Sequence, residues 1–309
     1  MPGRPLLIGT RGSPLALWQA RHVWKRLLEA GGLGEGDVGL NVITTSGDRI
    51  KDKPLREFGG KGLFTKEIDE ALLRGDVDLA VHSMKDLPAE LPRGLCIVAV
   101  LPRADVRDAF ISKKAPALSE LPPGAVVGTS SLRRAAQVMR RRPDLRVTNF
   151  RGNVETRLEK LEEGQADATL LALAGLERLG LASHATSILS TKEMLPAVAQ
   201  GAIGVTCRED DTRARALVEA LNDAAAATTV ACERSFLARL GGSCKTPIAG
   251  LAEIENGMLR FRGLILTPDG GEWYDIEVTG AAKNAQAIGA DAGAELLARA
   301  GPDFLAKLA

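Results

Sequence analysis

Leu7-Ile-Gly-Thr-Arg-Gly-Ser13 and Val127-Gly-Thr-Ser-Ser131 share one pattern, an apolar run that ends in glycine, threonine and serine. Each run predicts a short strand followed directly by a helix, which begins at Pro14 in the first copy and at Leu132 in the second. The serine before each helix is a good N-cap, and proline suits the first helical position. The repetition predicts two similar α/β lobes.

A second pair of passages supports the repeat. Residues 75–82 read as a helix-ending glycine followed by a buried strand, and residues 164–173 read the same way. The chain crosses from the first lobe to the second near residues 102–106 and returns through residues 195–204, rich in proline, glycine and alanine. We expect doubly wound α/β lobes that resemble periplasmic binding proteins, with these crossovers as a hinge and the ligand cleft between the lobes.

The pattern changes from about residue 221. A helix is predicted to end at the Gly241-Gly242 pair, and three alternating runs follow at 248–254, 258–266 and 272–278, separated by turn sequences. A helix over about 283–300 closes the chain, so we expect a small α+β domain with a three-stranded antiparallel sheet. The expected domains are residues 1–101 with 200–220, residues 102–199, and residues 221–309.

Composition excludes several classes of protein. Lysine and arginine total 40 against 39 acidic residues, which gives a formal charge of +1, and aromatic residues make up only 4%. A nearly neutral chain with few rings is not typical of a nucleic-acid or membrane-surface binder. The four cysteines lie far apart with no neighbouring histidines, so no metal site or disulfide is expected. The sequence predicts neither a membrane helix nor a signal peptide, which favours the cytoplasm.

Basic and hydroxyl side chains follow the predicted strands. Ligands of α/β sheets bind beyond the carboxyl ends of the strands, and arginine forks and helix N-termini favour carboxylates or phosphates. A multiply charged anion is therefore predicted, although each arginine could instead be solvated or paired with a carboxylate. The strand-end residues are Arg11, Ser13, Ser83, Lys85, Asp86, Thr129, Ser130, Ser131, Arg133, Arg134, Arg151, Arg157 and Arg178.

Two further residues have a chemical character of their own. Asp86 is the one acidic residue of this basic set and could cap a helix, pair with Lys85, or stabilise positive charge and transfer protons. Cys244 lies two residues after the Gly241-Gly242 pair and directly before Lys245, a setting that favours the thiolate, so it is the candidate nucleophile or attachment point. Cys96, Cys207 and Cys232 and the three histidines fit structural roles.

Several motifs in register resemble the porphobilinogen deaminase family, also called hydroxymethylbilane synthases. They are Thr10-Arg-Gly-Ser-Pro-Leu-Ala16, Gly59-Gly-Lys-Gly-Leu-Phe64, His82-Ser-Met-Lys-Asp86, Gly128-Thr-Ser-Ser-Leu-Arg-Arg134, Arg151-Gly-Asn153 and the loop around Cys244. The resemblance implies a transferase of tetrapyrrole (haem) biosynthesis that condenses porphobilinogen, with loss of ammonia, into the linear tetrapyrrole hydroxymethylbilane. It also implies a dipyrromethane cofactor, made from the substrate, that is attached by a thioether to Cys244 and extended stepwise.

The resemblance assigns a role to each matching residue. Asp86 matches the catalytic carboxylate, which would contact pyrrole N–H groups, stabilise the cationic azafulvene left by ammonia, and move protons. The residues that match cofactor-binding positions are Ser83, Lys85, Asp86, Thr129, Ser131, Arg133, Arg134 and Arg157, and those that match substrate-binding positions are Arg11, Ser13, Gln19, Arg151, Arg178 and Gln200. Ser243 and Ala199 stand where the family pattern has glycine, which affects only the flexibility of the loop and the hinge.

A two-lobed anion-binding protein without catalysis, such as a solute receptor or a sensor domain, is the alternative. Cys244 argues against it, because a receptor has no need of that thiol, and a periplasmic receptor also requires an export signal. We expect a cytoplasmic monomer that acts on a small molecule. The glycine-bearing stretch of residues 46–62 fits a mobile cover that carries Lys61 toward the pyrrole chain.

Overall fold

The computed structural model describes residues 4–49, 64–242 and 246–307. The chain divides into two compact units. The first comprises Met1–Asp52, Gly60–Ala104 and Ala202–Ala227, and the second comprises the remaining segments, mainly Asp105–Gly201 and Thr228–Ala309. Among the described residues, no helix is both long and apolar enough to cross a membrane.

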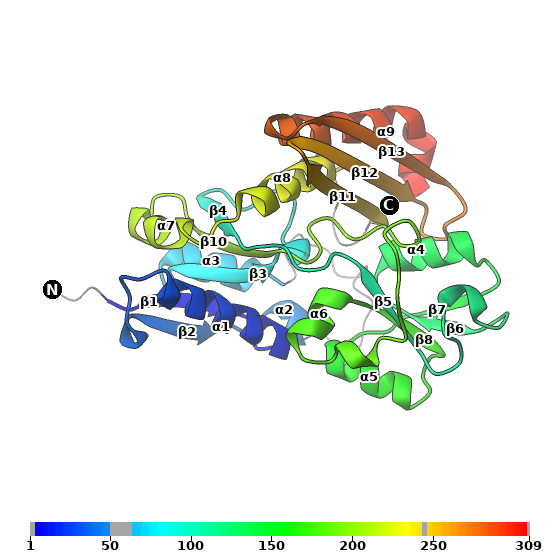
Figure 1. Cartoon of the computed structure of the whole chain (residues 1–309), viewed down its shortest axis with the longest axis horizontal. Helices are drawn as coiled ribbons and strands as arrows, with labels where there is room; N and C mark the ends of the chain where they lie inside the picture. Colours follow the sequence, from blue (N-terminus) through cyan, green and yellow to red (C-terminus); the bar gives the residue numbers. More distant parts are fainter. Residues whose placement is uncertain (1–3, 50–63, 243–245, 308–309) are drawn as a thin grey trace. The chain divides into compact units, whose positions relative to one another are not determined.

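The first unit is built on a five-stranded sheet with the order β2-β1-β3-β10-β4. β1 pairs in parallel with β2 and β3, whereas β10 runs antiparallel to β3 and β4. Figure 1 shows β10 among strands from the beginning of the chain. The returning chain therefore supplies the interior strand that joins β3 to β4. The elements are β1 Leu6–Thr10, α1 Pro14–Glu29, β2 Val38–Val42, α2 Ser46–Arg49, α3 Lys66–Arg74, β3 Leu79–Ser83, β4 Leu95–Val100, β10 Ile203–Arg208 and α7 Thr212–Glu219.

The second unit contains a sheet of the same design, with the order β7-β6-β8-β5-β9. β6 pairs in parallel with β7 and β8, and β5 runs antiparallel to β8 and β9. The predicted pair of α/β lobes is therefore confirmed, and each sheet contains one antiparallel strand from the chain that has just crossed over. The elements are β5 Asp108–Ser112, β6 Val126–Gly128, α4 Leu132–Arg141, β7 Arg146–Thr148, α5 Val154–Glu162, β8 Ala168–Ala172, α6 Leu173–Arg178 and β9 Ser187–Ile188.

The strand-to-helix junctions follow the predicted capping. The Ser13 hydroxyl accepts a hydrogen bond from the Ala16 N–H at 3.3 Å, with Pro14 opening α1. In the second lobe the Ser131 hydroxyl accepts one from the Arg134 N–H at 3.4 Å. Because each cap fixes where its helix begins, Arg11 and the Arg133-Arg134 pair lie at the carboxyl ends of β1 and β6.

The C-terminal part of the second unit contains the predicted three-stranded antiparallel sheet, β11-β12-β13. Phe261 of β12 packs on Phe236 of α8, with ring centroids 4.8 Å apart, so apolar rings join the sheet to this helix. The closing helix extends past the predicted residue 300 and breaks at Gly301, where φ is 71°. The elements are α8 Ala224–Arg239, β11 Ile248–Glu255, β12 Met258–Leu266, β13 Trp273–Ala281 and α9 Ala285–Lys307, and short 3-10 turns elsewhere cover Glu35–Asp37, Met84–Asp86, Leu118–Glu120, Ala182–His184 and Ala282–Asn284.

Glycines allow α9 to lie directly against α8. A Cβ atom at Gly289 would be 1.9 Å from the Cys232 carbonyl oxygen, and one at Gly293 would be 2.8 Å from the Arg239 Cβ. Contact distances this short exclude a side chain at Gly289 unless the helices separate.

Replacing Gly289 with alanine is expected to lower the free energy of unfolding by about 1–3 kcal/mol, the usual cost of overpacking. Helix propensity alone predicts the opposite sign, because alanine is better than glycine by about 1 kcal/mol in a helix interior. Chemical denaturation measures the difference. Gly36→Ala is the control, because nothing lies within 4 Å of a Cβ there. A Gly289→Ala protein as stable as the wild type would contradict the close helix contact.

Candidate active site

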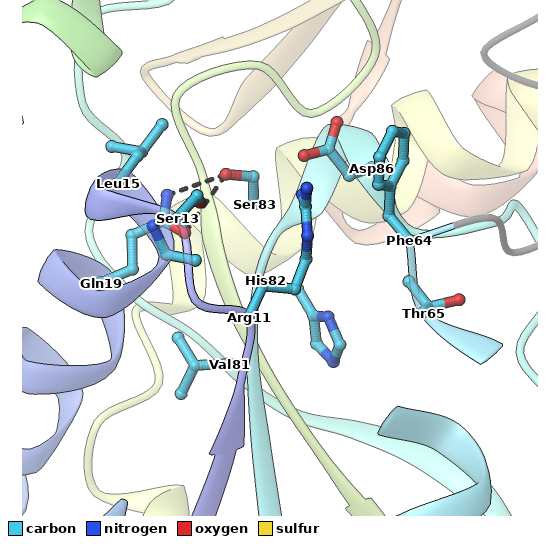
Figure 2. Close-up of a pocket in the computed structure, with 11 residues that line it drawn as sticks. Arg11, Ser13, Leu15, Gln19, Phe64, Thr65, Val81, His82, Ser83 and Asp86 are labelled. Atoms are coloured by element: carbon cyan, nitrogen blue, oxygen red, sulfur yellow. Dashed lines mark hydrogen bonds between the residues drawn. The ribbon is translucent and has the colours of Figure 1, made fainter. Parts of the chain in front are cut away.

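A pocket lies at the carboxyl ends of β1 and β3 in the first unit. Its lining includes Arg11, Ser13, Gln19, His82, Ser83 and Asp86, together with Phe64 and Thr65 just before α3. In Figure 2 the Gln19 side chain of α1 meets Ser83, and the Arg11 guanidinium extends toward the side of Asp86 and Phe64, whereas the His82 ring points the opposite way from that guanidinium. The structure thus brings together five residues that the sequence analysis assigned to substrate or cofactor.

Gln19 and Ser83 hold each other in place across this pocket. The Gln19 amide donates a hydrogen bond to the Ser83 hydroxyl at 2.8 Å, and Gln19 is almost fully buried. A buried amide whose partner is fixed has few alternative rotamers. The pair therefore presents polar atoms in a defined arrangement at the pocket wall.

Arg11 lies between a carboxylate and an aromatic ring. Its guanidinium forms an ion pair with Asp48 of α2 and stacks over the Phe64 ring at 4.4 Å from the centroid. Burial opposes ionisation of Asp48, but hydrogen bonds from Arg11 and Thr45 outweigh it and hold the pKa of this carboxyl below its usual range. A substrate carboxylate would therefore have to share Arg11 with Asp48.

Asp86 closes the 3-10 turn that follows β3, and its side chain is exposed. The turn is anchored by Met84, whose backbone N–H donates to the Ala202 carbonyl at 3.0 Å and whose side chain is buried. The Met84 side chain packs directly against the backbone of Gly204 in β10, where a Cβ atom would be 1.9 Å from the Met84 sulfur. The position of Asp86 thus depends on a close contact between β10 and this turn.

His82 is buried beneath the pocket, and its Nε2 lies 3.2 Å from the Thr206 hydroxyl. Burial, with a smaller effect from Arg11, lowers the pKa of His82 to about 4 from an ordinary 6.5. The folded protein therefore keeps this imidazole neutral in a range where the unfolded chain protonates it.

The stability that depends on neutral His82 is present above about pH 6.5 and is lost as the pH falls toward 4. At pH 4 the loss from this group is about 3 kcal/mol, since each pKa unit is worth about 1.4 kcal/mol. Asp69 has the opposite effect on stability, because burial raises its pKa to about 6 and its protonation at low pH therefore favours the folded state. The change in the free energy of unfolding between pH 7 and pH 4 is therefore compared in two proteins. His82→Gln should show a smaller fall than the wild type. Parallel pH profiles would contradict the prediction.

In the second unit, three predicted residues, Arg133, Arg134 and Gln200, surround the Asp108 carboxylate, which the sequence did not single out. Arg133 and Arg134 are buried in the first turn of α4, and each donates through Nη2 to Asp108 at 2.7 Å. The sequence left open whether each arginine pairs with a carboxylate of the protein, and both Arg133 and Arg134 do. One signal could have found Asp108: it is the charged residue that opens the otherwise apolar strand Ala109-Phe-Ile111.

Other predicted residues of the second unit lie away from Asp108. Arg157 donates through Nε to the Asn153 carbonyl at 3.2 Å, and Arg178 donates to the Gly201 carbonyl at 2.7 Å. Burial lowers the pKa of Arg178 to about 10, which leaves it charged at neutral pH. By contrast, Gln200 is fully buried and donates to Asp108. Cys244, with Ser243, and most of the predicted cover including Lys61 lie outside the described residues.

Two family models match this chain, one over its first two thirds and one over its C-terminal part. The family model described as "Porphobilinogen deaminase, dipyromethane cofactor binding domain" matches residues 6–216, and "Porphobilinogen deaminase, C-terminal domain" matches residues 227–298. The chain belongs to the porphobilinogen deaminase family. The predicted resemblance is thereby confirmed, and so are an enzyme of tetrapyrrole biosynthesis and its dipyrromethane cofactor.

Porphobilinogen deaminases from distant organisms match nearly the whole chain. The porphobilinogen deaminase of Paracoccus denitrificans is 56% identical over 98% of this chain and 97% of its own length. The chloroplastic porphobilinogen deaminase of Oryza sativa subsp. japonica is 54% identical over 97% of this chain and 86% of its own length. Among solved structures, a periplasmic substrate-binding protein of an ABC transporter from Coxiella burnetii covers 74% of this chain and 96% of its own, at 17% identity and a TM-score of 0.45.

The residues of the second unit fit the cofactor of porphobilinogen deaminases. The buried Nε atoms of Arg133 and Arg134 have no hydrogen-bond partner in the described part of the chain. Unsatisfied buried donors on cations are costly unless an acceptor reaches them. The acidic side chains of a dipyrromethane are acceptors of the required charge.

Proposed function

We propose that this chain condenses porphobilinogen stepwise into hydroxymethylbilane, on a dipyrromethane attached by a thioether to Cys244. The observation that carries the proposal is the pocket of the first unit, where the exposed Asp86 carboxylate shares a lining with Arg11 and Ser83. One carboxylate among cationic and hydroxyl groups suits a substrate whose acidic arms need cations and whose reacting centre becomes positive.

Arg11, Ser13 and Gln19 bind the carboxylates of the incoming porphobilinogen in this proposal. Arg11 is placed for this by the end of β1 and by its stacking on Phe64. Guanidinium binds carboxylate through two parallel hydrogen bonds, which orient the substrate as well as attract it. Arg151 and Arg178 are assigned to the same ligand class by family position, and Arg133, Arg134 and Arg157 are assigned to the carboxylates of the dipyrromethane.

Asp86 acts on the electron-poor centre. The aminomethyl group of porphobilinogen takes up a proton and leaves as ammonia, so that its methylene carbon and the pyrrole ring share a positive charge. The Asp86 carboxylate accepts a hydrogen bond from the pyrrole N–H and stabilises that charge. When the new carbon–carbon bond forms, the attacked ring position loses a proton, and Asp86 helps to carry it away. The bound dipyrromethane supplies the terminal pyrrole carbon that is first extended.

Incubation of the purified protein with porphobilinogen tests this function. We expect one ammonia released per porphobilinogen consumed and, after oxidation of the cyclised product, a uroporphyrin-type absorbance. Binding of porphobilinogen without ammonia release would identify a receptor and overturn the proposal.

We also propose a cytoplasmic monomer with the domains 1–101 plus 200–220, 102–199 and 221–309. The grouping of Ala202–Ala227 with the first unit supports the discontinuous first domain, whereas plant relatives carry chloroplastic names. Light scattering of the purified chain and fractionation of its source cells test the first two points, and limited proteolysis tests the boundaries.

A further inference from the structure

Asp108 joins three donors from two separate parts of the second unit. It opens β5, is fully buried, and accepts hydrogen bonds from Arg133 and Arg134 of α4 at 2.7 Å each. Its third donor is the Gln200 amide, at 2.9 Å. Three donors on one carboxylate leave its orientation little freedom.

The cluster keeps a net positive charge. Two guanidiniums face one carboxylate, and all three groups are buried. Burial alone favours the neutral acid, but the two guanidiniums outweigh it and hold the pKa of Asp108 well below its ordinary value. Asp108 is therefore ionised throughout the physiological range, and the excess charge belongs to the arginines.

The two arginines have different donors left. Arg133 uses Nη2 on Asp108 and Nη1 on the Leu195 carbonyl, at 2.7 Å each. Within the described part of the chain, the Arg134 guanidinium has Asp108 as its hydrogen-bond partner, and the Nε atoms of both arginines have none. Since a guanidinium has five N–H groups, Arg134 retains more donors for an anion than Arg133 does.

The network also fixes both segments that enter or leave this lobe. Gln137 holds Leu195 from both sides, accepting its N–H at 2.8 Å and donating to its carbonyl at 3.0 Å. Gln200 donates to the Val106 carbonyl at 2.7 Å as well as to Asp108. Buried hydrogen bonds thus tie α4 to Asp108 and Leu195, and Gln200 ties Asp108 to Val106.

We propose that Asp108 is a positioning residue for dipyrromethane binding. It fixes the Arg133-Arg134 pair so that the remaining donors, mainly those of Arg134, face the acidic side chains of the cofactor, and Gln200 holds Asp108 in place. This inference rests on the proposed function, in which the two arginines bind the cofactor. It assigns Gln200 an indirect role through Asp108 in place of substrate contact.

The test measures uptake of the cofactor by apoprotein, made in cells that cannot supply porphobilinogen. Porphobilinogen is then added, and the intact mass is followed with time for Asp108→Asn, Asp108→Glu and the wild type. Asn removes the charge at nearly constant shape, whereas Glu keeps the charge and displaces the guanidiniums by about one methylene. Asp78→Asn is the matched control, because Asp78 is also buried and pairs with two arginines, Arg4 and Arg208, outside the proposed ligand set.

We expect Asp108→Asn to take up the cofactor at least tenfold more slowly than the wild type, with a lower melting temperature. Asp108→Glu should remain folded and be intermediate in uptake, because both the charge and the position of the carboxylate determine where the two guanidiniums lie. Asp78→Asn should lose stability but take up the cofactor at the wild-type rate. Wild-type uptake by folded Asp108→Glu and by any folded Asp108→Asn would overturn the inference, and so would slow uptake by Asp78→Asn. Wild-type protein that never gains mass would instead refute the proposed function.

Discussion

Turnover of porphobilinogen by an Asp86→Asn variant is expected to fall about 100- to 1000-fold, the loss seen when a preorganised charge-stabilising group is removed from an active site. Asparagine has nearly the same shape as aspartate, but its neutral amide cannot stabilise the positive charge left when ammonia departs, nor accept the proton released on bond formation. The change should appear in kcat, because in the proposed mechanism the carboxylate acts after the substrate has bound. Steady-state ammonia release measures it.

The same variant should keep its fold, since Asp86 is exposed, and its covalent pyrrole, since the attachment thiol of Cys244 is unchanged. Glu90→Gln, an exposed carboxylate a few residues further along, serves as the control and should retain wild-type turnover. An Asp86→Asn protein within a factor of three of the wild-type rate would rule out the proposed role. A raised KM with unchanged kcat would place Asp86 in substrate binding alone.

A Cys244→Ala variant is expected to carry no covalent pyrrole and to have no measurable turnover. Without the thiolate no thioether forms, so no chain end is held for extension. Intact-mass spectrometry of the variant should give the mass of the polypeptide alone, whereas the wild type should be heavier.

Replacement of Cys96 by alanine is the control for this experiment. Cys96 is half-buried and lies 3.8 Å, sulfur to sulfur, from Cys207 on the neighbouring strand β10, a setting that suits a structural thiol. Cys96→Ala should therefore keep the full adduct. An adduct on Cys244→Ala, or its loss from Cys96→Ala, would assign the attachment to another residue.

Local chemistry explains why much of the fold could be predicted. Ser13 and Ser131 cap their helices in the same way, and both follow short apolar strands. The repeat could therefore be predicted from residues that are adjacent in the sequence. The hairpins of the C-terminal sheet were equally local, because turn sequences separate runs of alternating residues.

Contacts between distant parts of the chain could not be predicted in the same way. β10 lies between β3 and β4, which are more than a hundred residues earlier, and no local pattern specifies that place. The partners of the arginines depend on the same topology: Arg11 meets Asp48, and Arg134 meets Asp108, only after the sheets have formed. The residue types alone therefore predicted that arginines bind an anionic ligand. The carboxylates of the protein that pair with these arginines could be identified only from the structure.

In the proposed function, porphobilinogen units are added one at a time to a pyrrole chain held covalently by this polypeptide. The test of this claim mixes wild-type protein with a few equivalents of porphobilinogen, stops the reaction with acid within seconds, and analyses the protein by intact-mass spectrometry. We predict a ladder of masses above the starting protein, spaced by one porphobilinogen minus one ammonia, with every step on the peptide that contains Cys244. A single unchanged protein mass, while ammonia and tetrapyrrole accumulate in solution, would contradict the claim.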